Sequence, residues 1–151
     1  MTTTMNRLPV STWNPLGVNC APASAALPTV PADGWAKAEP LCPALPAGVT
    51  APAEADFTNF AASGMGAEAD AWLLENANLV NHLAVTGTAD APVVFETALD
   101  ADHPHALTCL TIDAAEGSSL TVVQVVRGDA ENGVSANLTC IRAAEGAHVV
   151  L

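Results

Sequence analysis

The chain has 151 residues, of which half are apolar and 13 % are charged, a composition typical of a folded domain that can bury a core. Sixteen acidic residues against four basic ones give a formal net charge of −12 at pH 7. Nucleic acids and anionic membranes attract clusters of Lys and Arg, so this charge argues against both as partners.

The sequence carries no apolar run of the roughly 18 residues that a membrane span needs. Residues 1–10 lack the apolar core and the positive start of a signal peptide. We therefore expect a cytoplasmic protein, in which thiols stay reduced. The four cysteines, at positions 20, 42, 109 and 140, are too far apart for a zinc-finger or thioredoxin-like motif.

Residues 1–56 are predicted to form a leader and a proline-rich arm. Prolines deny a helix in the leader, residues 1–19, and the many prolines of residues 20–56 leave neither a helical nor a strand period. The arm is thus expected to be irregular, with polyproline character. Trp35, its one aromatic residue, is expected to tether it to the rest of the chain.

Residues 57–76 are predicted to be a short helical segment in two pieces. The first is a turn near residues 56–62, and Gly64-Met65-Gly66 breaks it. The second piece, residues 67–76, has good helix formers and an apolar stripe at Ala71, Leu73 and Leu74.

Residues 77–151 change to a strand pattern and form the predicted β domain. Short segments rich in β-branched residues alternate with turn sequences that contain Gly, Asp and Pro, and no helix separates them. The predicted fold is therefore mainly β. Its strands are expected at residues 79–86, 93–99, 106–112, 119–127, 135–142 and 147–151.

The stretch from Leu107 to Leu151 contains two similar copies of one sequence. The two Ala-Ala-Glu-Gly segments lie 29 positions apart, whereas the two Leu-Thr-Cys segments lie 31 apart. A slip of two residues keeps every side chain on its face of a strand. The repetition favours parallel strands stacked as in a β-helix over the antiparallel pairs of a sandwich or a cupin-like roll. Stacking is expected to bring together Cys109 and Cys140, Leu110 and Ile141, and Leu120 and Val149.

Motifs for catalysis are missing from the sequence, which has neither a P-loop nor a Gly-x-Ser-x-Gly elbow. We therefore predict that the chain is not an enzyme. His103 and His105 are the candidate metal ligands, because two imidazoles share one turn with Asp100 and Asp102. A solvated turn is the competing interpretation.

The remaining reactive side chains have structural interpretations. Cys109 and Cys140 are expected to be small buried apolar groups, with a thiolate ligand pair or a redox pair as the alternative. His82 is expected to be structural. His148 is expected on an exposed strand position that faces Ser119, and the turn acids Glu116 and Glu145 are expected to point to solvent.

Several segments resemble one protein family. The opening Leu-Pro-Val-Ser-Thr-Trp-Asn-Pro-Leu-Gly-Val-Asn, at residues 8–19, is similar to that of the shorter bacterial SufD-like proteins. Gly64-Met65-Gly66 with the acidic helix after it also resembles that group. So do Pro-Val-Val-Phe at residues 92–95 and the two copies at 114–123 and 143–151, which resemble early turns of the SufB/SufD core.

The resemblance implies a right-handed parallel β-helix and a part in iron–sulfur cluster assembly. Members of this family act as a scaffold: SufD works with SufB and with the ATPase SufC, and the cluster is built on the assembled complex. The resemblance therefore implies SufB-like and SufC-like partners and no cofactor bound by this chain alone. Family members are more than twice as long, so the β-helix is expected to be truncated at the C-terminus, and no ligand residue is carried over.

An incomplete β-helix leaves an apolar edge that invites strand pairing. The predicted partner interface is therefore Ala147, His148, Val149, Val150 and Leu151, and the predicted state is a homodimer. The alternative function is a small cupin-like or sandwich-like β-domain that binds a metal or a small molecule. Strand direction separates the two, because the alternative needs antiparallel pairs.

Overall fold

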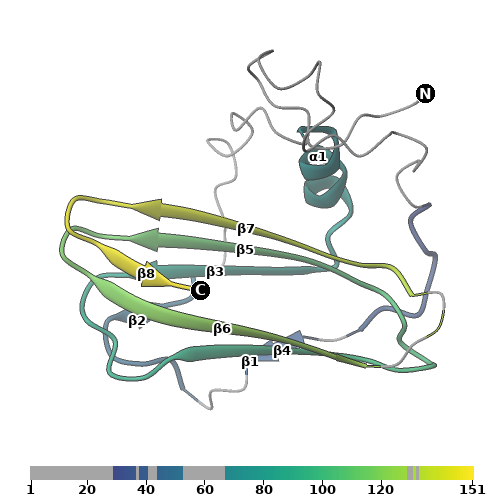
Figure 1. Ribbon diagram of the computed structural model, residues 1–151, viewed down its shortest axis with the longest axis horizontal. Coiled ribbons are helices and arrows are strands. Elements are labelled where there is room, and N and C mark those ends of the chain that lie inside the picture. Colours follow the sequence, from purple (N-terminus) through teal and green to yellow (C-terminus); the bar gives the residue numbers. More distant parts are fainter. Residues whose placement is uncertain (1–28, 37, 41–43, 53–66, 129–130, 132) are drawn as a thin grey trace, which may run out of the picture.

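The computed structural model describes residues 29–36, 38–40, 44–52, 67–128, 131 and 133–151. This part of the chain is mainly β, with one short helix (Figure 1). The elements in chain order are β1 (Ala38–Pro40), β2 (Val49–Thr50), α1 (Ala67–Asn76), β3 (Leu79–Val85), β4 (Val93–Leu99), β5 (Ala106–Ala114), β6 (Ser119–Gly128), β7 (Ser135–Ala143) and β8 (His148–Val150).

The strands form two sheets of four. One, the helix-side sheet, has the order β2-β3-β5-β7, and the other, the far sheet, has the order β1-β4-β6-β8. From β3 onward the chain alternates between them, so that one pass is a strand of the helix-side sheet followed by a strand of the far sheet (Figure 1). The three passes are β3–β4, β5–β6 and β7–β8, and equivalent strands of successive passes pair in parallel.

A single register joins all three passes. Leu79 pairs with Thr108 in the helix-side sheet and Val93 with Val122 in the far sheet, so both pairs have the 29-position spacing of the Ala-Ala-Glu-Gly segments. The same offset pairs Ala106 with Ser135 and Ser119 with His148. The repeat of those segments therefore describes both sheets.

The 31-residue alignment of the cysteine segments is wrong. Cys109 pairs with Leu138, and Cys140 pairs with Thr111, so that the two cysteines are diagonal neighbours. Leu110 likewise pairs with Thr139 and not with Ile141, whereas the predicted pairing of Leu120 with Val149 is confirmed.

The tight turns explain this register. The N–H of Gly117 donates to the carbonyl of Glu145 (3.0 Å), and the N–H of Ala144 donates to the carbonyl of Ala114 (2.9 Å). Gly117 and Gly146 both have positive φ, of 66° and 69°, a conformation that glycine adopts without steric cost. The stacked turns therefore fix the register of the strands next to them.

The main core lies between the two sheets. Alternate residues of each strand point inward, and equivalent residues of successive passes stack on one another, as Leu83 does with Ile112 and Val93 with Val122. Branched side chains pack well on a pleated surface, which is why these short apolar segments form strands. The buried members of this core are Val49, Leu83, Val85, Val93, Phe95, Leu110, Ile112, Ala114, Leu120 and Val122.

The first pass is covered by two strands from the arm that was predicted to be irregular. β1 pairs antiparallel with β4, and β2 pairs antiparallel with β3. These strands are too short for a sequence period, and the edges of the sheets supply their pairing. Trp35 does attach the arm, since it pairs with His105 in an isolated bridge and its ring lies edge-on to the imidazole.

Helix α1, at the predicted position, covers the outer face of the helix-side sheet (Figure 1). Leu73 packs there against Leu107 and Cys109, with Trp72 and Leu74 beside them. In the described part of the chain, no helix is long and apolar enough to cross a membrane. The predicted turn near residues 56–62 and the segments at 8–19 and 64–66 lie outside the described residues.

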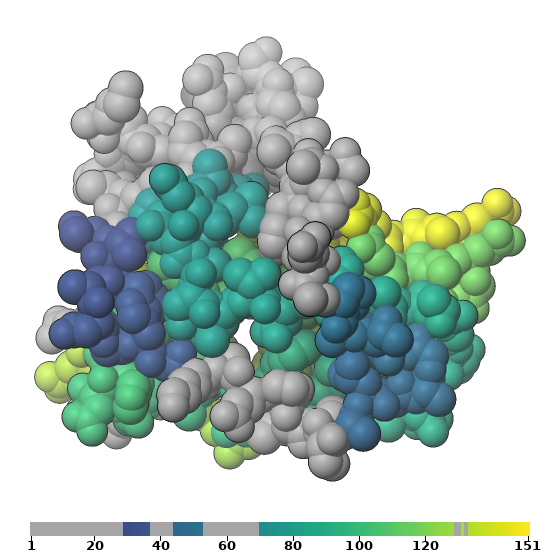
Figure 2. Space-filling model, turned by 180° about the vertical axis from the view of Figure 1, so that it is seen from behind, coloured from purple at the N-terminus to yellow at the C-terminus, as the bar shows by residue number. Residues whose placement is uncertain are grey.

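The third pass lies at the other end of the stack, and its turn between β7 and β8 projects at one margin of the molecule (Figure 1 and Figure 2). Within the described ranges, no strand pairs with the outer edge of β7 or β8. Ile141 stacks on Ile112, yet it is 41 % exposed whereas Ile112 is 0 % exposed. Side chains of the third pass that occupy core positions are therefore covered by the second pass on one side only.

Candidate functional site

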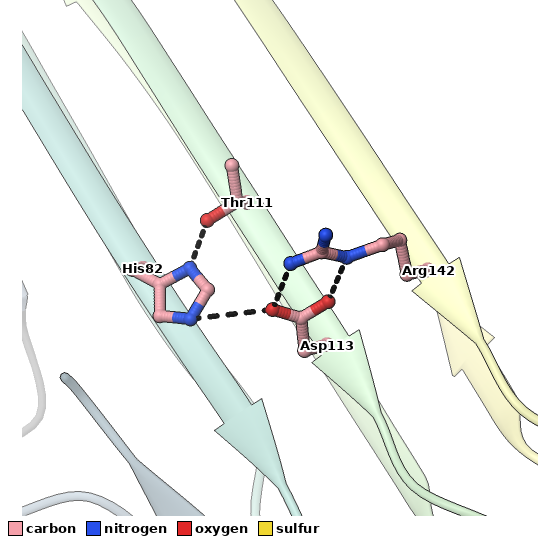
Figure 3. A network of polar contacts seen from close by, with 4 residues as sticks. All are labelled: His82, Thr111, Asp113 and Arg142. Atoms are coloured by element: carbon pink, nitrogen blue, oxygen red, sulfur yellow. Dashed lines mark hydrogen bonds and ion pairs between the residues drawn. The ribbon is translucent and has the colours of Figure 1, made fainter. Parts of the chain in front are cut away.

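A polar network crosses three strands on the outer face of the helix-side sheet (Figure 3). His82 comes from β3, Thr111 and Asp113 from β5, and Arg142 from β7. The 29-residue register places His82 level with Thr111, and Asp113 level with Arg142. Because side chains alternate along a strand, all four lie on the same face.

Asp113 is the centre of the network. The Nη2 atom of Arg142 donates to its Oδ2 atom at 2.7 Å, and Nε donates to Oδ1, which makes a bidentate pair. The Nε2 atom of His82 lies 3.4 Å from the same Oδ2 atom. The His82 side chain is only 8 % exposed, against 30 % for Asp113 and 33 % for Arg142. One carboxylate therefore links three adjacent strands.

Thr111, His82 and Asp113 follow the order of a nucleophile–base–acid relay. The Nδ1 atom of His82 is hydrogen-bonded to the Thr111 hydroxyl, and its Nε2 atom faces the Asp113 carboxylate. Thr111, however, is completely buried, so a substrate cannot reach its hydroxyl. The arrangement fits cross-bracing of the sheet better than nucleophilic attack.

An open depression of about 510 Å³ adjoins the network at the carboxyl ends of β3, β5 and β7. Small side chains at equivalent positions of the three passes leave this space, and Asp113 with Arg142 forms its polar border. Its walls are otherwise largely alkyl, from Ala84, Val85, Ala114, Ala115, Ala143 and Ala144.

The predicted metal ligands His103 and His105 are held by different partners. The Nδ1 atom of His103 lies 3.1 Å from the Oδ1 atom of Asp100. Hydrogen bonds from the backbone and ring of His103 lower the pKa of Asp100. The Nδ1 atom of His105 accepts the N–H of Val134 at 3.1 Å. No group of three or more His, Cys, Asp or Glu suited to a metal ion is found among the described residues.

Both described cysteines are free and buried. Burial raises the pKa of the Cys109 thiol to about 11, and the nearby Cys140 adds to this shift. Burial also raises the pKa of Cys140, with a further contribution from Asp70 on α1. These thiols are therefore protonated at neutral pH. Cys20 and Cys42 lie outside the described residues.

The predicted partner interface divides between surface and core. His148, Val150 and Leu151 are exposed, whereas Ala147 and Val149 are partly buried against the main core. The pairing of His148 with Ser119 is confirmed, and the turn acids Glu116 and Glu145 are both exposed as predicted.

The sequence pattern predicts a structural role for His82 but does not connect it with Asp113 and Arg142. The available signal was an acid and a base, Asp113 and Arg142, at the same spacing as the two Ala-Ala-Glu-Gly segments. In the 31-residue alignment, Asp113 and Arg142 are not at equivalent positions, so the pairing of the two charges is not seen.

Comparison with protein-family models, with curated proteins and with solved structures finds no match to this chain.

Proposed function

We propose that the chain is a SufD-like scaffold component of the SUF system for iron–sulfur cluster assembly. In this proposal it has no catalytic role and works in the cytoplasm with SufB-like and SufC-like proteins. Its three passes are the first turns of a right-handed parallel β-helix of the SufB/SufD core type. The iron–sulfur cluster belongs to the assembled complex, and this chain alone binds no cofactor.

The observation that carries the proposal is the constant 29-residue offset in both sheets. A chain that alternates between two parallel sheets with one period stacks supersecondary units, as repeat architectures do. A right-handed path is favoured because parallel crossover connections are almost always right-handed. Such a stack presents long surfaces for other proteins, which suits a scaffold.

The alternative, a cupin-like or sandwich-like domain, fits the strand directions less well. Those folds are built from antiparallel pairs, whereas β3, β5 and β7 are mutually parallel. The alternative also needs convergent metal ligands, and His103 and His105 have separate partners.

We further propose that the edge of the third pass pairs with another chain and that a second copy fills this role when SufB-like proteins are absent. Strand edges with exposed apolar residues favour such pairing. Here the edge carries Ile141, Val150 and Leu151, all partly exposed. Light scattering at micromolar concentration is expected to give a dimer, and a monomer would contradict this part of the proposal.

The scaffold function is tested by affinity capture with purified SufB-like and SufC-like proteins from the same source. We expect the tagged chain to retain the SufB-like protein, and the SufC-like protein through it. The variant Val150→Lys places a charge at the proposed interface, on an exposed residue of its edge strand, and should abolish capture. Glu116→Lys makes a charge change in an exposed turn of the second pass and is the matched control.

Capture by Glu116→Lys at the wild-type level, with loss in Val150→Lys, supports the proposed interface. Failure of the wild-type chain to retain either protein contradicts the scaffold proposal.

A further inference from the structure

Two buried thiols share the outer face of the helix-side sheet, under α1. Cys109 lies in the smaller apolar cluster with Leu73 and Leu107. Cys140 lies on β7, one strand further along the sheet, and is also buried. The two residues point to the same side because Cys109 pairs with Leu138, two positions before Cys140.

This diagonal relation is too wide for a disulfide. Neighbouring strands lie about 4.8 Å apart and each residue advances about 3.3 Å, so diagonal Cα atoms are roughly 8 Å apart. A disulfide needs Cα atoms within about 7 Å. Both side chains lie on the same face of the sheet, and Cys140 adds to the upward shift of the Cys109 pKa.

We propose that Cys109 and Cys140 form a two-thiolate site for a soft monovalent cation, with Cu(I) as the expected ion. An ion between the sulfurs spans a wider gap than a direct sulfur–sulfur bond. Thiolates are the ligands that select Cu(I) over harder metals. The inference is independent of the scaffold function, since it uses only these two side chains and their register.

The described residues around the sulfurs supply only these two ligands. His82 is the nearest imidazole along the sheet, but both of its ring nitrogens already have partners in Thr111 and Asp113. Leu73 and Leu138 supply apolar groups around the sulfurs and no further donor. Two sulfurs, with no third ligand among the described residues, suit an ion that accepts linear coordination.

Binding is an exchange of protons for the ion, without a redox step. Each thiol loses one proton to solvent, two S–Cu bonds form, and the Cu(I) complex carries one negative charge. Because both thiols are protonated at neutral pH, affinity should rise with pH as the proton competitor is removed. Asp70 on α1 acts on Cys140 only through its charge, since a carboxylate is a hard ligand that Cu(I) does not select.

The test compares two full-length variants that each keep two cysteines. Cys20→Ala/Cys42→Ala retains the proposed pair, and Cys109→Ala/Cys140→Ala retains the other two. Each is titrated under anaerobic conditions with Cu(I) held by a chromophoric chelator. The first variant is expected to remove one Cu(I) per chain from the chelator. The second should bind at least about tenfold more weakly, since even the loss of an outer-shell partner costs 10–100-fold.

X-ray absorption of the Cu(I)-loaded wild-type chain gives a second readout that does not depend on the folding of a variant. Two sulfur atoms at one distance, with no nitrogen or oxygen, support the site. Equal affinity of the two variants, no competition with the chelator, or a shell of three or more ligands would overturn it.

Discussion

The second and third passes of this chain share the Ala-Ala-Glu-Gly turn and the isoleucine just before it, but they differ in burial. Ile112 and Ile141 occupy equivalent positions, one 0 % and the other 41 % exposed. The difference arises because the second pass has a neighbour on both sides, whereas β7 and β8 are the end strands of the described sheets. In a stack, the energetic value of a side chain therefore depends on its position among the passes more than on its local sequence.

The largest expected effect is in the core of the second pass. Ile112→Ala should lower the free energy of unfolding by about 3 kcal/mol, because a fully buried isoleucine leaves a cavity. Ile141→Ala should lower it by about 1 kcal/mol, since less area is removed from the interior. Urea denaturation monitored by circular dichroism measures both. Equal losses would show that the third pass is as well covered as the second.

The polar network gives the next largest effect. Asp113→Ala leaves Arg142 and His82 without the carboxylate that they share, and it should cost about 1–2 kcal/mol, reduced from the buried-pair value by partial exposure. Asp113→Asn keeps the shape and one acceptor, and it should cost less. Chemical denaturation in low and high salt checks this. If Asp113→Ala is as mild as Glu116→Ala at an exposed turn, the network does not brace the sheet.

Substituting the glycine of each tight turn should lower stability by a similar amount in the second and the third pass. Gly117→Ala and Gly146→Ala each force a side chain into positive φ, which costs about 1 kcal/mol. A Cβ atom on Gly117 meets nothing within 4 Å, so the cost is conformational and local. Thermal unfolding of the two variants should therefore show similar decreases. A much larger loss at one turn would mean that its surroundings differ.

The smallest effect on the folded protein at neutral pH is expected from the buried thiol. The pKa of Cys109 is raised to about 11 from 9.0, so the folded state favours the protonated form. Its contribution to stability is complete below pH 9 and is lost as pH rises toward 11. Alkylation by a small reagent, followed by peptide mass spectrometry, should stay slow at Cys109 until that range. Rapid labelling at pH 8 would contradict the burial.

Much of the β half followed from local pattern. The six segments rich in β-branched residues, bounded by Gly, Asp and Pro turns, gave strands close to those observed, and 93–99 matches β4. Helix α1 followed from its helix formers. β1 and β2 did not, because the edges of β4 and β3 supply their partners and their own sequence has no period.

The site was harder to predict for a related reason. A repeated sequence suggests a register between strands, but the hydrogen bonds between the stacked turns determine it. The choice of 29 over 31 decides whether Cys140 lies on Cys109 or beside it and whether Arg142 meets Asp113. The partners of a side chain in a stacked sheet come from a neighbouring pass, so an error of two residues moves every contact.

Cross-linking on the far sheet tests the 29-residue stack most directly. Thr121 pairs with Val150, whereas Ser119, two positions earlier on the same face, would be the partner of Val150 in the longer register. Directly paired Cα atoms lie about 4.8 Å apart, within disulfide range, and diagonal ones do not. Under mild oxidation, Thr121→Cys/Val150→Cys should form the intrachain disulfide, and Ser119→Cys/Val150→Cys should not. A bridge in the second variant but not in the first would contradict the stack.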